Sequence, residues 1–253
     1  MPNKVLETKN LNAYYGDFQA LFEVSIDLFE GEIIAIIGAN GAGKSTFMRS
    51  VTGLIDRIDN EINYKGLSIK GLRADEIAKK GLAMVPEGRK LFPSLSVEEN
   101  LLIGGQIKRL GPWELNTVYE LFPDLYDKRN IPSNLLSGGQ QQMAAIGRAL
   151  MSNPDVILFD EISLGLAPII IKSIYQNLPK VIQKGMSAII VEQDISKALE
   201  ISDRVYCLQE GRIALFGESK QLTRQEISKA YFCLLYTSDA ADEGLGVDLG
   251  GRR

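Results

Sequence analysis

The sequence predicts an α/β protein with a mostly parallel core sheet, an antiparallel β-subdomain and a helical subdomain. Short apolar runs recur along the chain with helical stretches between them, which is typical of parallel strands joined by crossover helices. Two earlier runs alternate apolar and polar side chains, and residues 96–151 follow a helical pattern instead. The 253 residues, 45% of them hydrophobic, can form one sizeable core with appended subdomains.

Each expected element follows from its local pattern. The alternating runs, residues 5–11 and 22–28, precede the turn signal Glu30-Gly31, and we expect antiparallel strands packed on one side. Core strands are expected at residues 32–37, 82–85, 156–159, 188–191 and 205–208. Helices are expected at residues 97–103, 113–122 and 139–151, separated by Gly-Pro at 111–112 and Pro-Asp at 123–124.

The segment from Gly38 to Thr46 fits the pattern G-x-x-x-x-G-K-[ST] in full, between an expected strand and a run that can begin a helix. Small residues let backbone N–H groups turn onto phosphate oxygens, and the helix N-terminus adds partial positive charge. Lys44 is expected to reach the β- and γ-phosphates, and Ser45 to hold Mg²⁺. The expected phosphate-binding residues are Gly38, Asn40, Gly41, Ala42, Gly43, Lys44, Ser45 and Thr46.

Two carboxylates, Asp160 and Glu161, follow the expected strand at residues 156–159. They stand at its carboxyl end, where open α/β sheets bind ligands. Alone, such a pair can also be a solvated strand end. Beside the phosphate loop, we expect Asp160 to hold Mg²⁺ and Glu161 to orient or deprotonate an attacking water. The sequence contains no histidine, so catalysis must rest on carboxylates, lysine and a bound metal.

A second glycine-containing run, Leu-Ser-Gly-Gly-Gln at residues 136–140, directly precedes the helix expected at 139–151. Ser137, Gly138, Gly139 and Gln140 would form another anion-receptive helix N-terminus. Alternatively, Ser137 is simply a helix cap. One nucleotide can hardly reach both phosphate-binding ends within one monomer, so a second copy or a homologue would supply one of them.

The phosphate loop, the Leu-Ser-Gly-Gly-Gln run and the Asp-Glu pair, in this order, resemble the nucleotide-binding subunit of an ABC transporter over residues 1–232. The resemblance implies one ATP-hydrolysing cassette, with core and β-subdomain in residues 1–95 and 152–232 and a helical subdomain in 96–151. It also implies a head-to-tail dimer, in which Ser137, Gly138 and Gly139 face the γ-phosphate bound by Lys44 of the other subunit. Tyr15 would stack on adenine; alternatively it is an ordinary aromatic at a strand end.

Three further runs, at residues 85–89, 160–168 and 191–194, resemble more narrowly the ATPase subunits of branched-chain amino acid importers. Urea, short amides and other amino acids remain open as cargo. The implied partners are a homologous ATPase subunit, two transmembrane permease subunits and, through the permease, a periplasmic or extracellular substrate-binding protein. The implied location is the cytoplasmic face of the inner membrane, where the permease subunits would hold the chain peripherally.

Some positions depart from the general ABC pattern. Glu87 stands where most members have a glutamine that touches Mg²⁺ and the attacking water; it can accept a hydrogen bond but adds negative charge. Gln193 replaces the usual switch histidine; it can donate to the γ-phosphate but cannot be protonated. Leu166 replaces the usual aspartate, which puts signalling across the dimer through that residue in doubt, and Ile162 replaces a common proline. Residues 91–95 stand where the family docks a permease coupling helix, although they also fit an apolar interior.

Other functions are less favoured. The net charge of −4 gives no basic excess for nucleic acid. A non-transport ABC protein acting on DNA or ribosomes would usually carry a coiled-coil insertion or a second cassette. A non-hydrolysing regulatory module would fit Glu87 and Gln193, but Glu161 argues against it. The N-terminus lacks the apolar core of a signal peptide, and no apolar run reaches the ~18 residues of a membrane span.

The last segment, residues 233–253, differs in character from the rest of the chain and resembles a translated sequencing adapter. Our hypothesis is that the natural chain is interrupted near Phe232 and that this tail is non-native and disordered. A genuine flexible C-terminus is the alternative. The segment is left out of the expected fold.

Overall fold

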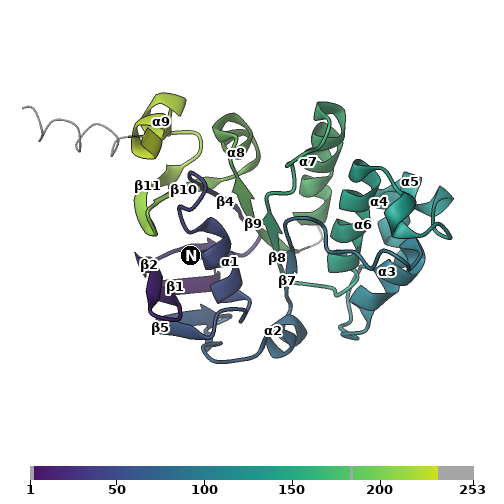
Figure 1. The fold of residues 1–253 in the computed structure, drawn as a ribbon, viewed down its shortest axis with the longest axis horizontal. Helices are drawn as coiled ribbons and strands as arrows, with labels where there is room; N and C mark the ends of the chain where they lie inside the picture. The colour runs from purple at the N-terminus through teal and green to yellow at the C-terminus, as the bar shows by residue number, and fades with distance from the viewer. Residues whose placement is uncertain (1–2, 183–184, 233–253) are drawn as a thin grey trace, which may run out of the picture.

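The computed structural model describes residues 3–182 and 185–232. The tail expected at 233–253 lies outside the described residues. Two sheets and a separate group of helices make up the molecule, with the helices α3 to α6 at one end (Figure 1). The phosphate loop packs against residues 20–21 and residues 208–211, away from this helical end.

The core sheet has six strands in the order β11-β10-β4-β9-β8-β7. The strands from β10 to β7 are mutually parallel, and β11 pairs antiparallel with β10. Their bounds are β4 (Ile33–Ile37), β7 (Leu82–Val85), β8 (Val156–Asp160), β9 (Ser187–Glu192), β10 (Arg204–Gln209) and β11 (Arg212–Glu218). The predicted mostly parallel core sheet is therefore confirmed, and β11 is an edge strand that the sequence analysis missed.

The second sheet is antiparallel, in the order β2-β1-β5-β6 with β3 on the other part of β1. Its strands are β1 (Lys4–Tyr15), β2 (Phe18–Val24), β3 (Asp27–Phe29), β5 (Arg57–Tyr64) and β6 (Leu67–Ser68). The single strand expected at residues 22–28 is wrong, because β2 and β3 are separated at residues 25–26. The Thr8 hydroxyl closes this break by donating to the Val24 carbonyl (3.1 Å) and accepting from the Ile26 N–H (3.0 Å).

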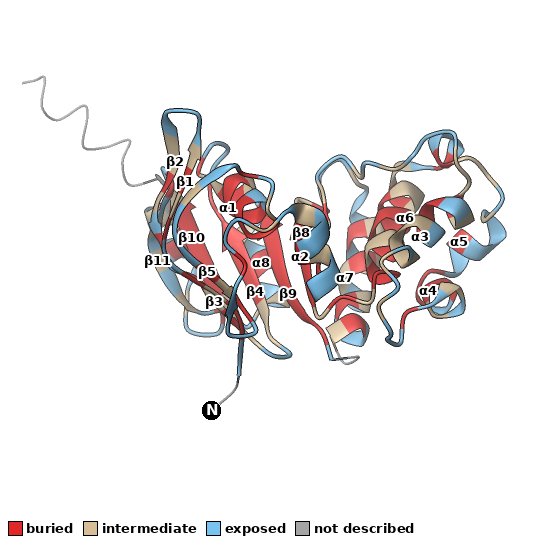
Figure 2. Cartoon of the chain, turned by 90° about the horizontal axis from the view of Figure 1, so that it is seen from below, coloured by how far each residue is buried: buried red, intermediate tan, exposed pale blue. Residues whose placement is uncertain are grey.

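Helices cover both faces of the core sheet. The first, α1 (Lys44–Val51), packs between the two sheets, while α8 (Ile195–Ile201) and α9 (Arg224–Phe232) cover the opposite face. Strands β8 and β9 are buried along their whole length, as Figure 2 shows in red. Burial on both faces explains why these strands are continuous apolar runs rather than alternating ones. The remaining helix beside the core, α2 (Ala74–Lys80), precedes β7.

The helical end contains α3 (Val97–Gly105), α4 (Leu115–Leu121), α5 (Pro123–Asp127), the 3₁₀ turn η1 (Ser133–Leu135) and α6 (Gly138–Leu150). It shares one apolar cluster with the adjoining face of β8 and β9 and with α7 (Pro168–Ile182). The helix expected from residue 113 begins only at Leu115. Asn153 holds the Trp113 backbone outside the helix, since its side chain accepts from the Trp113 N–H (2.8 Å) and donates to the Trp113 carbonyl (3.0 Å). No helix in the described ranges is long and apolar enough to cross a membrane.

We expect Asn153→Ala to lower the free energy of unfolding by roughly 2–3 kcal/mol. The substitution removes three hydrogen bonds to Trp113 and Arg109, each worth about 0.5–1.5 kcal/mol. Urea unfolding followed by circular dichroism measures the change. Asn177→Ala is the matched control: Asn177 bonds within α7 and to Lys180, and alanine favours the helix, so stability should not fall. Equal stability of Asn153→Ala and the unmodified chain would contradict the prediction.

Candidate nucleotide site

The phosphate loop runs from the end of β4 at Ile37 to the start of α1 at Lys44. Gly43 precedes the helix in the left-handed region (φ 103°), and a Cβ there would lie 2.7 Å from the Leu21 side chain. No side chain caps α1, so its first N–H groups stay available to a ligand. Only glycine fits Gly43, because both its backbone conformation and its contact with β2 exclude a side chain.

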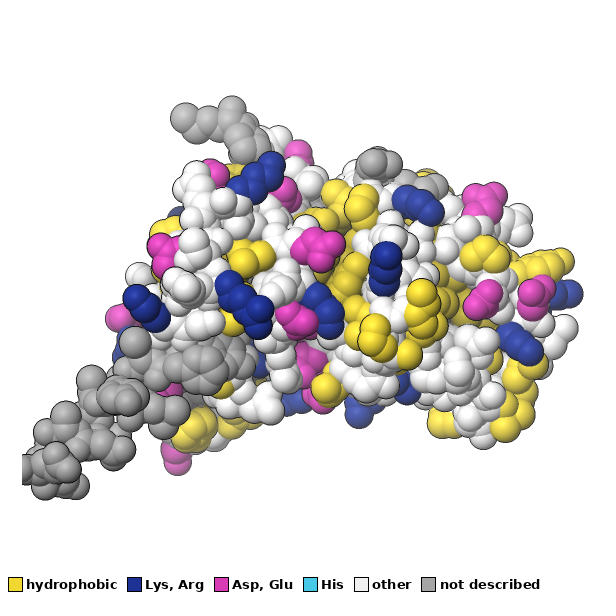
Figure 3. Space-filling model, turned by 90° about the horizontal axis from the view of Figure 1, so that it is seen from above, with side chains coloured by type: hydrophobic (Ala, Val, Ile, Leu, Met, Phe, Trp, Pro, Cys, Tyr) yellow, Lys and Arg dark blue, Asp and Glu magenta, His cyan; other side chains and the backbone are white. Residues whose placement is uncertain are grey.

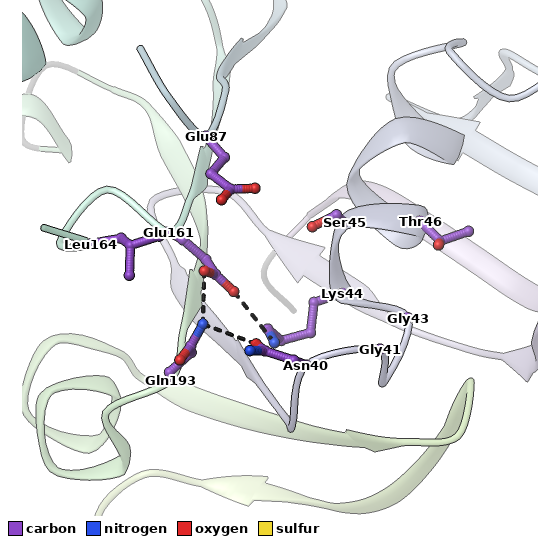
Figure 4. A pocket seen from close by; sticks show the side chains of 10 residues that line it. All are labelled: Asn40, Gly41, Gly43, Lys44, Ser45, Thr46, Glu87, Glu161, Leu164 and Gln193. Atoms are coloured by element: carbon purple, nitrogen blue, oxygen red, sulfur yellow. Dashed lines mark hydrogen bonds and ion pairs between the residues drawn. The ribbon is translucent and has the colours of Figure 1, made fainter.

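An open cavity of about 420 Å³ lies at the carboxyl ends of the parallel strands (Figure 4). Such ends are where α/β sheets bind ligands. The lining residues come from the phosphate loop and from the ends of β7, β8 and β9: Asn40, Gly41, Gly43, Lys44, Ser45, Thr46, Glu87, Glu161, Leu164 and Gln193. All but Leu164 were given roles by the sequence analysis. Leu164 has no chemical signal of its own and lines the cavity because it follows Glu161 in the same loop.

Lys44 is nearly fully buried, with 5% of its surface exposed. Its ammonium donates to the carbonyl oxygens of Gly38 (2.8 Å) and Ala39 (3.1 Å), and its Nζ lies 3.4 Å from Oε1 of Glu161. Buried charges require such partners. Two of the three N–H groups of the ammonium donate to neutral carbonyl oxygens. Charged phosphate oxygens would be stronger acceptors for them.

Glu161 and Gln193 meet across the cavity. The Gln193 Nε2 amide donates to Oε2 of Glu161 (2.8 Å) and to Oδ1 of Asn40 (3.1 Å), as the dashed lines in Figure 4 mark. Glu161 has a left-handed backbone (φ 48°), which is uncommon for a residue with a side chain and is typical of functional sites. The two sides of the cavity are thus joined by a carboxylate, an amide and the phosphate loop.

Asp160 lies behind the cavity, 5% exposed, and accepts a hydrogen bond from the Ser45 hydroxyl (3.4 Å). Burial, together with the nearby Glu161 and Glu87 carboxylates, raises the pKa of Asp160 above its ordinary value. A bound cation would relieve this excess of negative charge. Among the described residues, no group of three acidic or cysteine side chains is close enough to hold a metal alone. Oxygen ligands from a nucleotide would have to complete the shell, which suits Mg²⁺.

The other candidate residues lie outside the cavity lining. Gly38 contributes its carbonyl to Lys44, and Ala42 is buried. Tyr15 ends β1 with 43% of its surface exposed, and its hydroxyl accepts from Arg49 (3.4 Å). Ser137, Gly138, Gly139 and Gln140 all stand at the start of α6, away from the lining of this cavity. The structure therefore does not bring the two predicted phosphate-binding ends together within one chain.

The start of α6 has a complete capping box. Oγ of Ser137 accepts from the Gln140 N–H (3.3 Å), and Oε1 of Gln140 accepts from the Ser137 N–H (3.1 Å). A Cβ on Gly139 would lie 2.8 Å from the Ile170 side chain of α7, so glycine permits close packing there. Ser137 is therefore a helix cap in this chain, as one of the two interpretations expected. A cap does not prevent the same helix start from contacting a ligand.

The loop after β7 is tied to α6 by two arginines that the sequence analysis gave no role. Arg148 donates to the carbonyls of Lys90 (2.7 Å) and Arg89 (3.1 Å), while Arg89 donates to Oε1 of Gln141 (2.9 Å). Burial lowers the pKa of the Arg148 guanidinium. Nothing in the sequence indicated these contacts. The left-handed conformation of the loop residues Arg89 and Lys90, which the contacts stabilise, is visible only in the structure. Glu87, at the cavity, is therefore connected to the helix that begins after Ser137.

Comparison with known proteins agrees with this geometry. A family model described as ABC transporter matches residues 21–163. The chain belongs to the ABC transporter family. Over 230 residues it is 42% identical to the high-affinity branched-chain amino acid transport ATP-binding protein BraG of Pseudomonas aeruginosa, covering 90% of this chain and 99% of that protein. The predicted family is therefore confirmed, and this ABC subunit is an ATPase.

Two further relatives differ in the cargo their names give. This ABC subunit is 33% identical over 225 residues to the probable branched-chain amino acid transport ATP-binding protein LivF of Archaeoglobus fulgidus, covering 88% of this chain and 95% of that one. It is 31% identical over 231 residues to the arginine transport ATP-binding protein ArtM of Bacillus subtilis, covering 89% and 96%. Similarity at this level extends across different amino acid cargoes.

Solved structures agree with the fold. A nucleotide-free ATP-binding cassette from an ABC transporter matches with a TM-score of 0.78 at 27% identity, covering 97% of this chain and 100% of that chain. The dimeric structure of a post-hydrolysis ATP-binding cassette bound to ADP and Pi matches with a TM-score of 0.75 at 27% identity, covering 86% and 100%. The predicted cassette fold of this ABC subunit is confirmed.

We expect Lys44→Ala to weaken ATP binding by this ABC subunit at least about tenfold. The substitution removes the buried ammonium that phosphate oxygens would take over from the two loop carbonyls, and a charge-assisted hydrogen bond is worth about 1.5–3 kcal/mol. Isothermal titration with ATP and Mg²⁺ measures the affinity. Lys79→Ala removes an exposed lysine paired with Asp75 and should leave the affinity unchanged. Equal affinities of the two variants would be incompatible with this role of Lys44.

Proposed function

We propose that this chain powers the import of branched-chain amino acids through an ABC permease. The carrying observation is the arrangement of Lys44, Glu161 and Gln193 around one cavity at the phosphate loop. The cargo rests on similarity alone, since it is named for the relatives at 42% and 33% identity. Urea, short amides and other amino acids remain alternative cargoes, because the transported molecule need not touch this subunit.

The proposed hydrolysis uses groups already aimed at the cavity. The terminal phosphates of ATP replace the carbonyls of Gly38 and Ala39 as partners of Lys44. Glu161 is then released from Lys44. It either accepts a proton from a water that lies in line with the γ-phosphate or orients that water. The Gln193 amide donates to the γ-phosphate oxygens. Phosphoryl transfer requires mainly such positioning and charge neutralisation.

Magnesium is the proposed metal cofactor. Ser45, Asp160 and Glu87 would supply the oxygen ligands of the protein, and the raised pKa of Asp160, caused by burial and by Glu161 and Glu87, fits a place for a cation. When bound, the ion would neutralise charge on the transferring phosphoryl group. Oxygen atoms are the ligands that Mg²⁺ prefers.

The proposed active form is a dimer with a second copy or a homologous ATPase. Ser137, Gly138 and Gly139 begin a 13-residue helix but do not line the cavity of their own chain. A partner chain could bring its own helix start to the γ-phosphate, where the N–H groups would act as in other anion sites. The similar dimeric cassette bound to ADP and Pi supports this arrangement.

Exposed apolar side chains fit such an interface. Leu135, Leu164 and Ile169, exposed by 72%, 53% and 71%, lie beside the α6 start, in the cavity lining and at the start of α7. Figure 3 shows apolar side chains gathered in the middle of one face. Large exposed apolar patches commonly mark interfaces.

The permease is proposed to dock at an apolar groove of about 290 Å³ between the core and the helical end. Its lining includes Leu54, Met84, Ile103 and Arg148. Among residues 91–95, Phe92 is 49% exposed, while Leu91 and Leu95 are half-buried. An apolar helix of a permease fits this groove, and Arg148 would pass its motion to the loop of Glu87. Through the permease the chain would sit at the cytoplasmic membrane face and serve a substrate-binding protein.

Glu161→Gln should lower ATP turnover at least about 100-fold while leaving ATP affinity within about threefold. Glutamine cannot accept the proton of the attacking water, and general-base catalysis contributes typically 10²–10⁴-fold. Steady-state phosphate release and equilibrium titration measure the two quantities. Glu23→Gln, which changes an exposed side chain of β2, is the control and should keep full turnover. Unchanged turnover in Glu161→Gln would remove this residue from the mechanism.

Glu161→Gln saturated with ATP and Mg²⁺ should also associate into dimers, alone or with its companion ATPase. Blocked hydrolysis traps the nucleotide between the phosphate loop of one chain and the Ser137 end of the other, whereas ADP lacks the γ-phosphate. Sedimentation with ATP and with ADP measures the difference. Adding Lys44→Ala to this variant should abolish the association. If the sedimenting mass corresponds to one subunit under all of these conditions, the dimer proposal is wrong.

A further inference from the structure

Glu192 is a buried carboxylate that the proposed mechanism does not use. It ends β9, directly before Gln193, and only 2% of its surface is exposed. The Ser163 hydroxyl donates to its Oε2 (2.8 Å), and the Tyr175 hydroxyl donates to its Oε1. No salt bridge to Glu192 forms within the described part of the chain. Its two charge-assisted hydrogen bonds therefore come from neutral hydroxyls on two different segments.

This carboxylate is costly to bury. The other residues of β9, including Val191, are buried as well, so an apolar side chain would suit the strand at this position. Burial raises the pKa of the Glu192 carboxyl, although the hydrogen bonds from Tyr175 and Ser163 act in the opposite direction. Replacing buried charges by apolar groups is often neutral or stabilising. Stability alone gives little reason for a carboxylate here, which directs attention to its two partners.

Ser163 lies in the loop that carries Glu161, and three cross-links join this loop to the end of β9. The Glu161 N–H donates to the Val191 carbonyl (3.2 Å), the Gln193 amide donates to Glu161 (2.8 Å), and Ser163 donates to Glu192. The cross-link of Glu192 joins two side chains that do not line the cavity. The loop and the strand end are thereby held as one unit.

Tyr175 extends this unit to α7. The same helix carries Ile170, whose side chain meets Gly139 at the start of α6. Glu192 is thus connected on one side to Glu161 and on the other, through α7, to the helix start proposed to face a partner's nucleotide. No other buried carboxylate described above joins these segments.

We propose that Glu192 is a positioning residue for hydrolysis, which holds the loop of Glu161 through Ser163 and fixes that loop to α7 through Tyr175. The inference rests on the proposed role of Glu161. Small displacements of a catalytic group can lower the rate strongly without weakening substrate binding. Loss of either hydroxyl should therefore reduce kcat rather than raise KM.

The test compares ATP turnover of Ser163→Ala and Tyr175→Phe with the unmodified chain. Each should lower kcat about tenfold and leave the KM for ATP within about twofold, since the phosphate loop is untouched. Ser163→Thr keeps the hydroxyl and should recover most of the loss. Tyr206→Phe is the matched control: it removes a hydroxyl that donates to Asp27 (2.8 Å), neither residue lines the cavity, and kcat should not change.

A second measurement separates positioning from general weakening. In the background of Glu192→Leu, which leaves no acceptor for either hydroxyl, adding Tyr175→Phe should cost less than about twofold in kcat, because the shared hydrogen bond is already lost. Additive losses would overturn the inference, as would equal losses in Tyr206→Phe. Glu161→Gln is assayed in parallel. If it loses turnover while Ser163→Ala and Tyr175→Phe keep theirs, only the positioning role fails; if it keeps turnover, the proposed function of Glu161 fails first.

Discussion

The buried ammonium of Lys44 is the constraint around which the site is organised. The parallel register pairs Ile37 with Glu192 and Val191 with Asp160, so the ends of β4, β9 and β8 meet at one edge. The loop after β4 then folds its carbonyls back onto Lys44, and Glu161 approaches from β8. A buried charge needs such compensation. The same positive charge and the same strand ends suit a polyphosphate, so the groups that compensate Lys44 in this structure also prepare the site for a nucleotide.

The helical end is attached to this edge of the sheet through contacts that would transmit its movement to the cavity. Arg148 holds two successive carbonyls of the loop after β7, at Arg89 and Lys90, both in left-handed conformations. Such a backbone persists only where its surroundings fix it. A displacement of α6 would therefore move the loop that carries Glu87. If the permease docks at the apolar groove as proposed, its motion would reach the cavity through Arg148 and the loop of Glu87.

The sequence analysis predicted what depends on local pattern. Continuous apolar runs identified the parallel strands, because both of their faces are covered, and the phosphate loop was recognisable from spacing alone. The break between β2 and β3 escaped prediction because Thr8, from another strand, supplies the missing hydrogen bonds. Contacts such as Arg148 to Lys90 join residues far apart in sequence and leave no periodic signal. The role of Ser137 toward a partner was expected from the family resemblance, and within one chain the structure describes only its cap.

Glu87 and Gln193 change the electrostatics of the cavity in complementary ways. Glu87 adds a third carboxylate beside Asp160 and Glu161, and ATP would bring further negative charge to a site where Lys44 is already buried against Glu161. A glutamine at position 87 would leave less negative charge to balance, so with Glu87 the proposed nucleotide site would depend more strongly on a divalent cation. Gln193 adds no charge, yet its two N–H groups reach Asn40 and Glu161 together and hold its orientation.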